Sequence, residues 1–166
     1  MDLTADQIAF REGMSRMGAA VNLITTDGPA GRHGLVASAV CSVTDSPPTV
    51  LVCINRRSFV HDLMLRNGSL CVNVLASQHQ DLCATFARYV EGVDRFASGT
   101  WTTLATGSPV LVDSNVSLDC RIGSVLEQGT HSVMFCEVRG VHLSDRPGAG
   151  LVYFSRDYHH LQTPPP

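Results

Sequence analysis

The segment 34–55 constrains this chain more than any other. It predicts two strands, over 35–43 and 49–55, joined by a turn at Asp45–Pro48, because Asp, Ser and Pro favour turns. The second strand is almost wholly apolar from Thr49 to Ile54, a pattern that predicts burial on both faces. The chain is therefore expected to build a sheet here, with its core around the second strand.

The first of these strands carries small side chains where a core strand normally carries bulk, namely Ala37, Ser38, Ala39, Cys41 and Ser42. Small side chains let a flat ligand approach the backbone, and a hydroxyl such as that of Ser38 or Ser42 can orient the ligand by a hydrogen bond. The same pattern also fits a tightly packed barrel strand without a ligand. The residues alone leave both interpretations open.

Length and composition are those of one ordinary globular domain, and we assign residues 1–166 to it. The 166 residues can bury a sizeable core, and 44% of them are hydrophobic while 16% are charged. So low a charged fraction predicts that further surface is covered by a partner subunit. A net charge of −3 without a basic run argues against nucleic acid, and no apolar run is long enough to span a membrane.

The chain has 6 cysteines and no C-x-x-C pair. Most of them lie in apolar strand patterns, where cysteine behaves as a small, inert hydrophobe. A disulfide framework or a metal cluster is a poor fit to this spacing, so we expect no metal site. A reducing, cytoplasmic location fits the cysteine usage better.

Three helix starts are predicted from capping signals. Thr4 with Gln7 forms a capping-box pattern, Ser58 is a candidate N-cap, and Ser77 with Gln80 repeats the capping box. Further strands are expected over 21–26, 70–75, 116–126, 131–143 and 151–154, the last of these before a tail, with 88–108 as an irregular surface excursion. Many strands and few short helices without a βαβ rhythm predict an antiparallel barrel.

Several segments taken together resemble the flavin reductase family, the small reductase components of two-component flavin monooxygenases. Within the family, the sequence is most similar to the reductase of the pyrimidine-utilisation pathway. The resemblance extends over 8–161, and it is carried by Phe10–Gly28, Ala37–Pro48, Val52–Arg56, Leu70–Leu75, Gly129–His131 and Leu151–His159.

The resemblance implies a mainly β fold, a split β-barrel of the flavin-reductase (FMN-binding) type with short flanking helices, assembled as a homodimer. It also implies hydride transfer from NADH (or NADPH) to FMN (or FAD), with the reduced flavin passed to a separate monooxygenase, for example in pyrimidine degradation. In such enzymes the protein positions nicotinamide C4 against flavin N5. Because the chain lacks a G-x-G-x-x-G motif, the nicotinamide nucleotide is expected to share the flavin groove.

By the same resemblance, Val36, Ala37 and Ser38 line the edge of the isoalloxazine ring, and Ser42 helps to hold the ribityl chain. The family usually has Thr at the position of Val36, so one hydroxyl is missing there. Asn55, Arg56 and Ser58 are expected around the flavin phosphate. Ser58 would act from a helix N-terminus and Arg56 by charge, although Arg56 also fits a solvated loop and Asn55 also fits a turn residue.

His131 is the candidate catalytic residue, expected to orient the nicotinamide and to stabilise charge on the flavin. Phe86 is expected against the flavin, although its helical spacing from Leu82 fits core packing equally well. Arg156 and Tyr158 are expected to close over the nicotinamide nucleotide.

Two other classes of protein fit the sequence. One is a flavin-binding or carrier protein without turnover, since one fold hosts both kinds of protein. The other is a thiol-dependent enzyme that uses Cys41 or Cys53 with His131.

Overall fold

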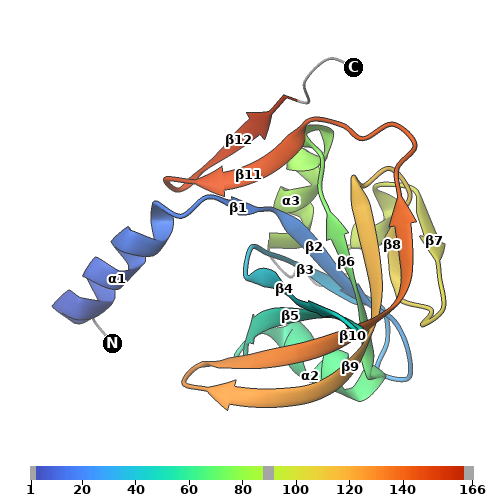
Figure 1. The fold of residues 1–166 in the computed structure, drawn as a ribbon, viewed down its shortest axis with the longest axis horizontal. Helices are drawn as coiled ribbons and strands as arrows, with labels where there is room; N and C mark the ends of the chain where they lie inside the picture. Colours follow the sequence, from blue (N-terminus) through green and yellow to red (C-terminus); the bar gives the residue numbers. More distant parts are fainter. Residues whose placement is uncertain (1–2, 88–91, 163–166) are drawn as a thin grey trace.

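A computed structural model describes residues 3–87 and 92–162, and it is mainly β (Figure 1). Its centre is a 7-stranded antiparallel sheet in the order β3-β2-β6-β9-β10-β5-β4. The strands of this sheet are β2 (Asn22–Thr26), β3 (His33–Ala37), β4 (Val40–Asp45), β5 (Pro48–Asn55), β6 (Ser69–Val74), β9 (Val116–Gln128) and β10 (His131–Leu143). The expected antiparallel barrel is confirmed.

The two edge strands of this sheet, β3 and β4, are consecutive in the chain and are joined only by Ser38–Ala39. The sheet therefore curls until its edges meet at this link, which we call the seam. Two backbone hydrogen bonds hold it, from Val40 N to the Ser38 carbonyl (2.9 Å) and from Cys53 N to the Ala39 carbonyl (3.0 Å). The single strand expected over 35–43 is thus wrong, and the chain changes edge within it without any residue that signals a turn.

Strand β5 is buried on one face only. Val50, Val52 and Ile54 point into the barrel, whereas Leu51 and Cys53 on the opposite face are half-buried. The expectation of burial on both faces is therefore wrong for the single chain. Apolar runs do not distinguish a core from a surface that a partner covers.

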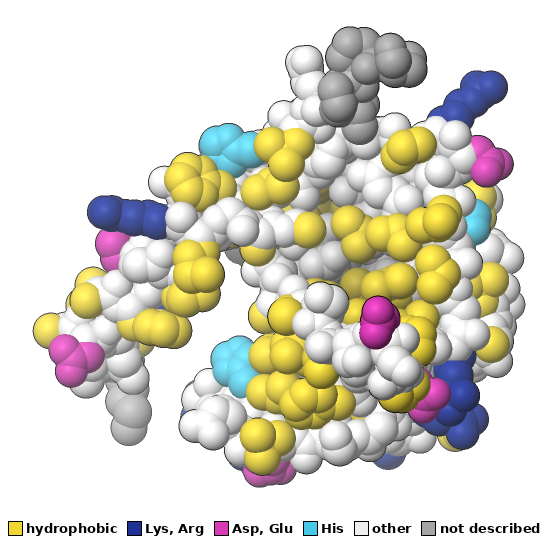
Figure 2. Space-filling view, in the orientation of Figure 1, with side chains coloured by type: hydrophobic (Ala, Val, Ile, Leu, Met, Phe, Trp, Pro, Cys, Tyr) yellow, Lys and Arg dark blue, Asp and Glu magenta, His cyan; other side chains and the backbone are white. Residues whose placement is uncertain are grey.

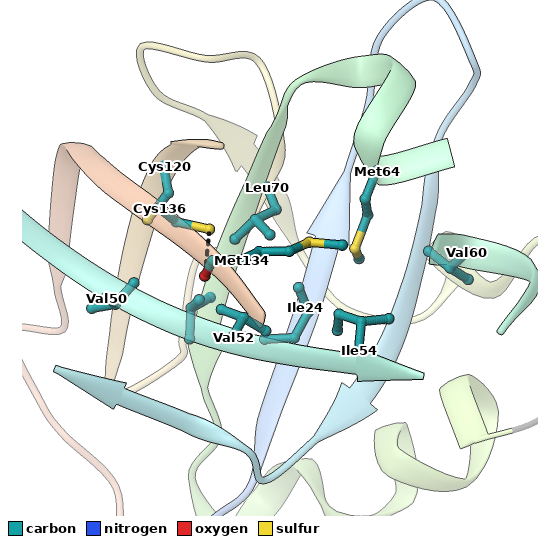
Figure 3. Packing of buried hydrophobic residues seen from close by; sticks show 11 residues of the cluster. Ile24, Val50, Val52, Ile54, Val60, Met64, Leu70, Cys120, Met134 and Cys136 are labelled. Atoms are coloured by element: carbon teal, nitrogen blue, oxygen red, sulfur yellow. Dashed lines mark hydrogen bonds between the residues drawn. The ribbon is translucent and has the colours of Figure 1, made fainter. Parts of the chain in front are cut away.

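The barrel interior is filled by aliphatic and sulfur-containing side chains (Figure 3). Ile24, Leu70 and Met134 come from the sheet, and Met64 reaches in from α2 (Phe59–Asn67). The predicted cap of α2 is confirmed, because the Ser58 side chain accepts a hydrogen bond from the Val60 amide. The first capping box is confirmed as well, with Thr4 and Gln7 at the start of α1 (Ala5–Ser15).

A second hydrophobic cluster, rich in aromatic rings, lies around α3 (Gln80–Ala87). The ring centroids of Phe86 and Phe96 are 5.1 Å apart, and those of Phe96 and Trp101 are 4.9 Å apart. The expectation of a surface excursion over 88–108 is wrong at Phe96, which is buried, while 88–91 lie outside the described residues. This region contains η2 (Arg95–Ala97) and β7 (Trp101–Thr103), and it is followed by β8 (Pro109–Leu111), which pairs with β7.

The start of α3 differs from the expected capping box at Ser77. The helix is preceded by a 3-10 turn, η1 (Ser77–His79), in which the His79 Nδ1 accepts a hydrogen bond from the Ala76 amide at 3.0 Å. Leu82 and Phe86 share the buried face of α3, as their spacing predicted.

A small sheet of β1 (Ala19–Ala20), β11 (Gly150–Phe154) and β12 (Asp157–Leu161) lies above the barrel in Figure 1. The prediction that 151–154 is the last strand is wrong. Ser155 and Arg156 have φ of 53° and 64°, so the chain reverses in a tight hairpin turn and pairs again. Neither residue is of the Asn-Gly type that reveals such turns in a sequence.

Helix α1 stands away from the rest of the molecule (Figures 1 and 2), and none of its described residues is buried. Its apolar side chains are open, with Phe10 67% and Met14 45% exposed. A groove of about 610 Å³ runs between α1 and the outer face of β4 and β5. Across the described ranges, no helix has the length and apolar character needed to cross a membrane.

Candidate active site

A cavity of about 400 Å³ opens at the seam. It brings together residues that the sequence analysis singled out from four separate segments: Val36, Ala37, Ser38, Asn55, Ser58, Phe86 and His131. Ligand pockets usually have volumes of about 300–1,000 Å³, so this one has the size for a small cofactor.

Edge backbone forms one wall of the cavity. Strand β3 is at the edge of the sheet and is hydrogen-bonded to β2 on its other side. Edge strands present N–H and C=O groups that can pair with a ligand. Phe86 packs directly on this strand, because a Cβ built at Gly34 would lie 3.0 Å from the Phe86 ring. The ring is 2% exposed, which confirms core packing, and it also borders the cavity, so contact of Phe86 with a flavin stays a prediction.

The loop from β5 to α2 supplies the polar end of the cavity. The Asn55 Oδ1 accepts a hydrogen bond from the Arg57 amide at 2.9 Å, which stabilises the loop as a turn residue would. Ser58 caps α2, and the first turn of a helix presents amide groups that attract anions. This end of the cavity suits a phosphate group.

His131 begins β10 and pairs in register with Asn55. The chain reaches it through Gly129, whose φ of 57° lies in the left-handed region that glycine adopts without strain. The imidazole Nδ1 lies 2.9 Å from the Thr130 hydroxyl, and the side chain is exposed. A solvent-accessible imidazole at the cavity can thus contact a second ligand that enters from solvent.

Ser42 and Arg56 lie outside this cavity. Ser42 is exposed on β4. Arg56 lines a neighbouring groove of about 490 Å³, and its guanidinium group lies 2.9 Å from the Glu127 carboxylate. Of the two expected phosphate partners, the cavity includes Ser58 and not Arg56.

Arg156 and Tyr158 border the site from the β11–β12 hairpin. Tyr158 lines a small cavity of about 210 Å³ that shares 36–38 with the first cavity. Arg156 lines the groove beside α1, which meets the seam at Ser38–Ala39, and its guanidinium group lies 2.8 Å from the Glu12 carboxylate. Both residues therefore adjoin the site without lining it.

Four lining residues had no place in the expected flavin site: Leu35, Cys53, Ile54 and Ala87, of which Cys53 was named only for the thiol-dependent alternative. The alternation along β5 could have revealed Cys53, because it lies between the inward-pointing Val52 and Ile54. Burial raises the pKa of the Cys53 thiol, and the nearby Cys41 raises it further. A raised pKa keeps a thiol protonated and unreactive.

The prediction of buried strand cysteines is confirmed for Cys71, Cys120 and Cys136, and it is wrong for Cys41, which is exposed, and for Cys53, which is half-buried. Burial raises the pKa of the Cys136 thiol to about 12. Cys41 lies on an edge strand beside the groove, so its apolar setting in the sequence did not make it part of the core.

Comparisons with known proteins agree with this geometry. The FMN reductase (NADH) RutF of Pseudomonas syringae pv. syringae is 52% identical over 161 residues, which cover 96% of this chain and 89% of that protein. A crystal structure of a protein assigned as a flavin reductase from Haemophilus somnus 129PT superimposes with a TM-score of 0.88 at 40% identity, over 96% of this chain and 100% of the other.

A homologue of nitrilotriacetate monooxygenase component B from Mycobacterium thermoresistibile superimposes with a TM-score of 0.87 at 27% identity, over 97% of this chain and 92% of that one. The sequence profile of the flavin reductase like domain matches residues 14–162. The barrel, the cavity at its seam and these similarities lead to one assignment: the chain belongs to the flavin reductase family.

Proposed function

We propose that this protein is an FMN reductase that uses NADH. The observation that carries the proposal is the cavity at the seam, where edge backbone, small side chains, a helix N-terminus and an imidazole meet. The pyrimidine edge of a flavin alternates carbonyl acceptors with an N–H donor, as the edge of a β-strand does. Relatives that carry the name FMN reductase (NADH) and share about half of the sequence support the choice of FMN and NADH over FAD and NADPH.

The residues present fit a flavin mononucleotide. The exposed backbone of β3 and the seam suits the flat ring system, because Ala37, Ser38 and Ala39 leave room beside it. The Ser58 hydroxyl and the first amides of α2 suit the phosphate.

A bound flavin supplies the hydride acceptor, its N5 atom, to the nicotinamide of NADH. The remaining task of the protein is to orient the nicotinamide and to stabilise charge on the reduced flavin ring. His131 can donate a hydrogen bond to the nicotinamide amide or to negative charge on the reduced ring, which is electrostatic stabilisation rather than proton shuttling. Phe86 backs β3 and keeps the cavity wall in place. The thiol-dependent alternative is disfavoured for Cys53 by its raised pKa, since the thiolate is the nucleophile, and for Cys41 by its place outside the described lining of the cavity.

We further propose that the reduced flavin passes to a separate monooxygenase, in pyrimidine degradation. The name of the Mycobacterium relative, a monooxygenase component, and the similarity to RutF proteins support this role. An open cavity also suits a product that has to leave. A reducing, cytoplasmic location is supported by the free thiols at 41, 53, 71, 83, 120 and 136.

We propose that two copies of the chain form a homodimer through α1 and the outer face of β5. The apolar side chains Ile8, Phe10 and Met14 of α1 are exposed, and the groove beside the helix is lined by Met14, Met17 and Leu51. A second copy would cover these residues, in keeping with the low charged fraction of the sequence.

Turnover is the direct test of this function. Purified protein should oxidise NADH faster when micromolar FMN is added, with FMN as the electron acceptor, measured by absorbance under anaerobic conditions. A protein that binds FMN in a fixed ratio and leaves the NADH oxidation rate unchanged would instead be a flavin carrier.

The role of His131 is tested by its removal. His131→Ala should slow reduction of bound FMN by NADH by about 10- to 1,000-fold, the usual range for lost positioning and electrostatic stabilisation. His131→Asn keeps a hydrogen-bond donor and should recover part of the rate. The matched control is His142→Ala, a half-buried histidine farther along β10 that does not line the cavity and whose Nε2 lies 2.8 Å from the Val112 carbonyl. An unchanged reduction rate in folded His131→Ala protein would remove His131 from the site.

A further inference from the structure

A chain of hydrogen bonds joins α2 to β10 through Asp62, His61 and Ser132. The His61 Nδ1 lies 2.7 Å from the Asp62 carboxylate, and its Nε2 lies 2.9 Å from the Ser132 hydroxyl. Because a carboxylate only accepts, Nδ1 carries a proton, and in the neutral ring Nε2 accepts from Ser132. The two linked side chains are almost wholly buried, with His61 5% and Ser132 1% exposed.

Each end of this bridge adjoins a residue of the candidate site. Ser132 directly follows His131 at the start of β10. His61 lies in the first turn of α2, where its amide donates to the carbonyl of Ser58 at 3.1 Å. The bridge therefore connects the strand end that carries the imidazole to the helix end that suits the phosphate.

The order Asp-His-Ser resembles a hydrolase triad in its hydrogen bonds, but it does not act as one. Ser132 is buried in the sheet, and it is absent from the described lining of the cavity. A nucleophile has to reach its substrate, which the Ser132 hydroxyl cannot do. A buried and satisfied polar pair serves a different purpose, since it fixes one geometry where apolar contacts would allow several.

We propose that His61 is a positioning residue that fixes His131 relative to the N-terminus of α2. This inference rests on the proposed function. The turn before β10 is exposed, and the start of the strand is also held by its pairing with β5 and β9 and by a backbone hydrogen bond from the Arg56 amide to the Thr130 carbonyl, of 2.9 Å. The His61 bridge adds a side-chain tie from this strand end to α2, so its loss allows the two to shift relative to each other, and a displacement of about 1 Å at a reacting group can cost up to about 100-fold in rate.

The first test compares two buried serines. Ser132→Ala removes the bridge, while Ser114→Ala removes a similar hydrogen bond to Ser117, of 2.7 Å, outside the cavity. At saturating FMN and NADH, Ser132→Ala should slow flavin reduction about tenfold. The flavin reduction rate of Ser114→Ala should stay within about twofold of the wild-type rate, even if its melting temperature falls as much as that of Ser132→Ala. Equal slowing in both variants would overturn the proposal.

The second test asks whether the effect passes through His131. In protein that already carries His131→Ala, Ser132→Ala should cause little further slowing, because coupled residues are not additive. Additive losses would show that the bridge acts elsewhere. His61→Leu should reproduce the Ser132→Ala defect, and His61→Gln, which can still bond to Ser132, should restore part of the rate. If His61→Gln reduces flavin as slowly as His61→Leu, the positioning role of His61 is contradicted.

A third measurement needs no turnover, so it separates this inference from the proposed function. Hydrogen exchange of the Arg56 amide should be faster in Ser132→Ala than in Ser114→Ala or wild type, because its acceptor Thr130 is loosened. Unchanged exchange refutes the positioning role whatever the enzyme does. Faster exchange in a protein that does not reduce FMN would refute the proposed function and leave the structural bridge established.

Discussion

The barrel and helix α1 differ in how far each buries its own apolar side chains. Inside the barrel, Ile24, Leu70 and Met134 are wholly buried, and the strands around them are paired except at the seam. Helix α1 is well capped, yet its apolar residues face solvent. An isolated helix of this length is marginal in water, so α1 needs tertiary or quaternary contacts to persist.

This difference indicates two kinds of apolar residue in one chain. Those of the barrel stabilise the single chain, whereas those of α1 and the outer face of β5 are available to a partner. The two kinds look alike in the sequence. They should separate in experiments that vary protein concentration, because an interface responds to mass action and a monomer core does not.

The largest effect is expected at the helix. Phe10→Ser combined with Met14→Ser should weaken the proposed dimer by about 6–12 kcal/mol, since each of the two chains loses two side chains and each side chain buried in the interface contributes about 1.5–3 kcal/mol. Sedimentation equilibrium should show dissociation at micromolar concentration. Ala9→Ser, on the same helix, is the control and should leave the mass unchanged. If the wild-type protein sediments as a monomer, the proposed dimer interface is wrong.

The next effect concerns the barrel interior. Met134→Ala should lower the free energy of unfolding by about 2–5 kcal/mol, because the fully buried side chain leaves a cavity. In urea titrations, this loss should not depend on protein concentration, whereas the loss caused by Met14→Ala should. The same concentration dependence for both methionines would erase the proposed difference between barrel and helix.

The smallest effect concerns the contact that fastens α1 to the β11–β12 hairpin. Hydrogen bonds from Arg156 and then Arg16 lower the pKa of the partly exposed Glu12 carboxyl below its usual 4.5. A depressed folded-state pKa means that the contact stabilises above pH 4.5 and is lost as the pH falls through the lowered pKa.

Exchange of the Ser155 amide, which donates to the Ser15 carbonyl, measures this contact. After correction for intrinsic exchange, protection should fall on acidification below pH 4.5 in wild type. Glu12→Gln should show weaker protection that changes little with pH. Full protection of wild type down to pH 3, as strong as at neutral pH, would argue that Glu12 does not fasten the helix.

Much of the fold could be predicted because local signals agree with the final structure. The cap at Ser58 and the extent of β10 were both visible in the sequence. The break at Ser38–Ala39 was not, because closure of a barrel is a long-range event and both residues also suit a strand. Phe96 was placed on the surface because its Gly- and Thr-rich neighbours concealed a contact with Phe86 across the fold.

The site was predictable only as a set of residue types. Ser38, Ser58 and His131 were named from the sequence, and the fold brings them to one cavity. Arg56 was named for its charge, yet its guanidinium group pairs with Glu127, a residue distant in sequence. The partners of a long charged side chain depend on the tertiary structure, which no local pattern records.

The seam has a consequence for stability as well as for binding. A ligand that spans β3, Ser38–Ala39 and the loop before α2 would join the two edges of the sheet, β3 and β4, which do not pair with each other. Such a ligand binds the folded chain and not the unfolded one, so at 100 times its dissociation constant it adds about 2.7 kcal/mol to stability. Release of reduced flavin would then loosen the barrel at the same step that empties the site, and the resting fold of the protein would depend on the flavin supply around it.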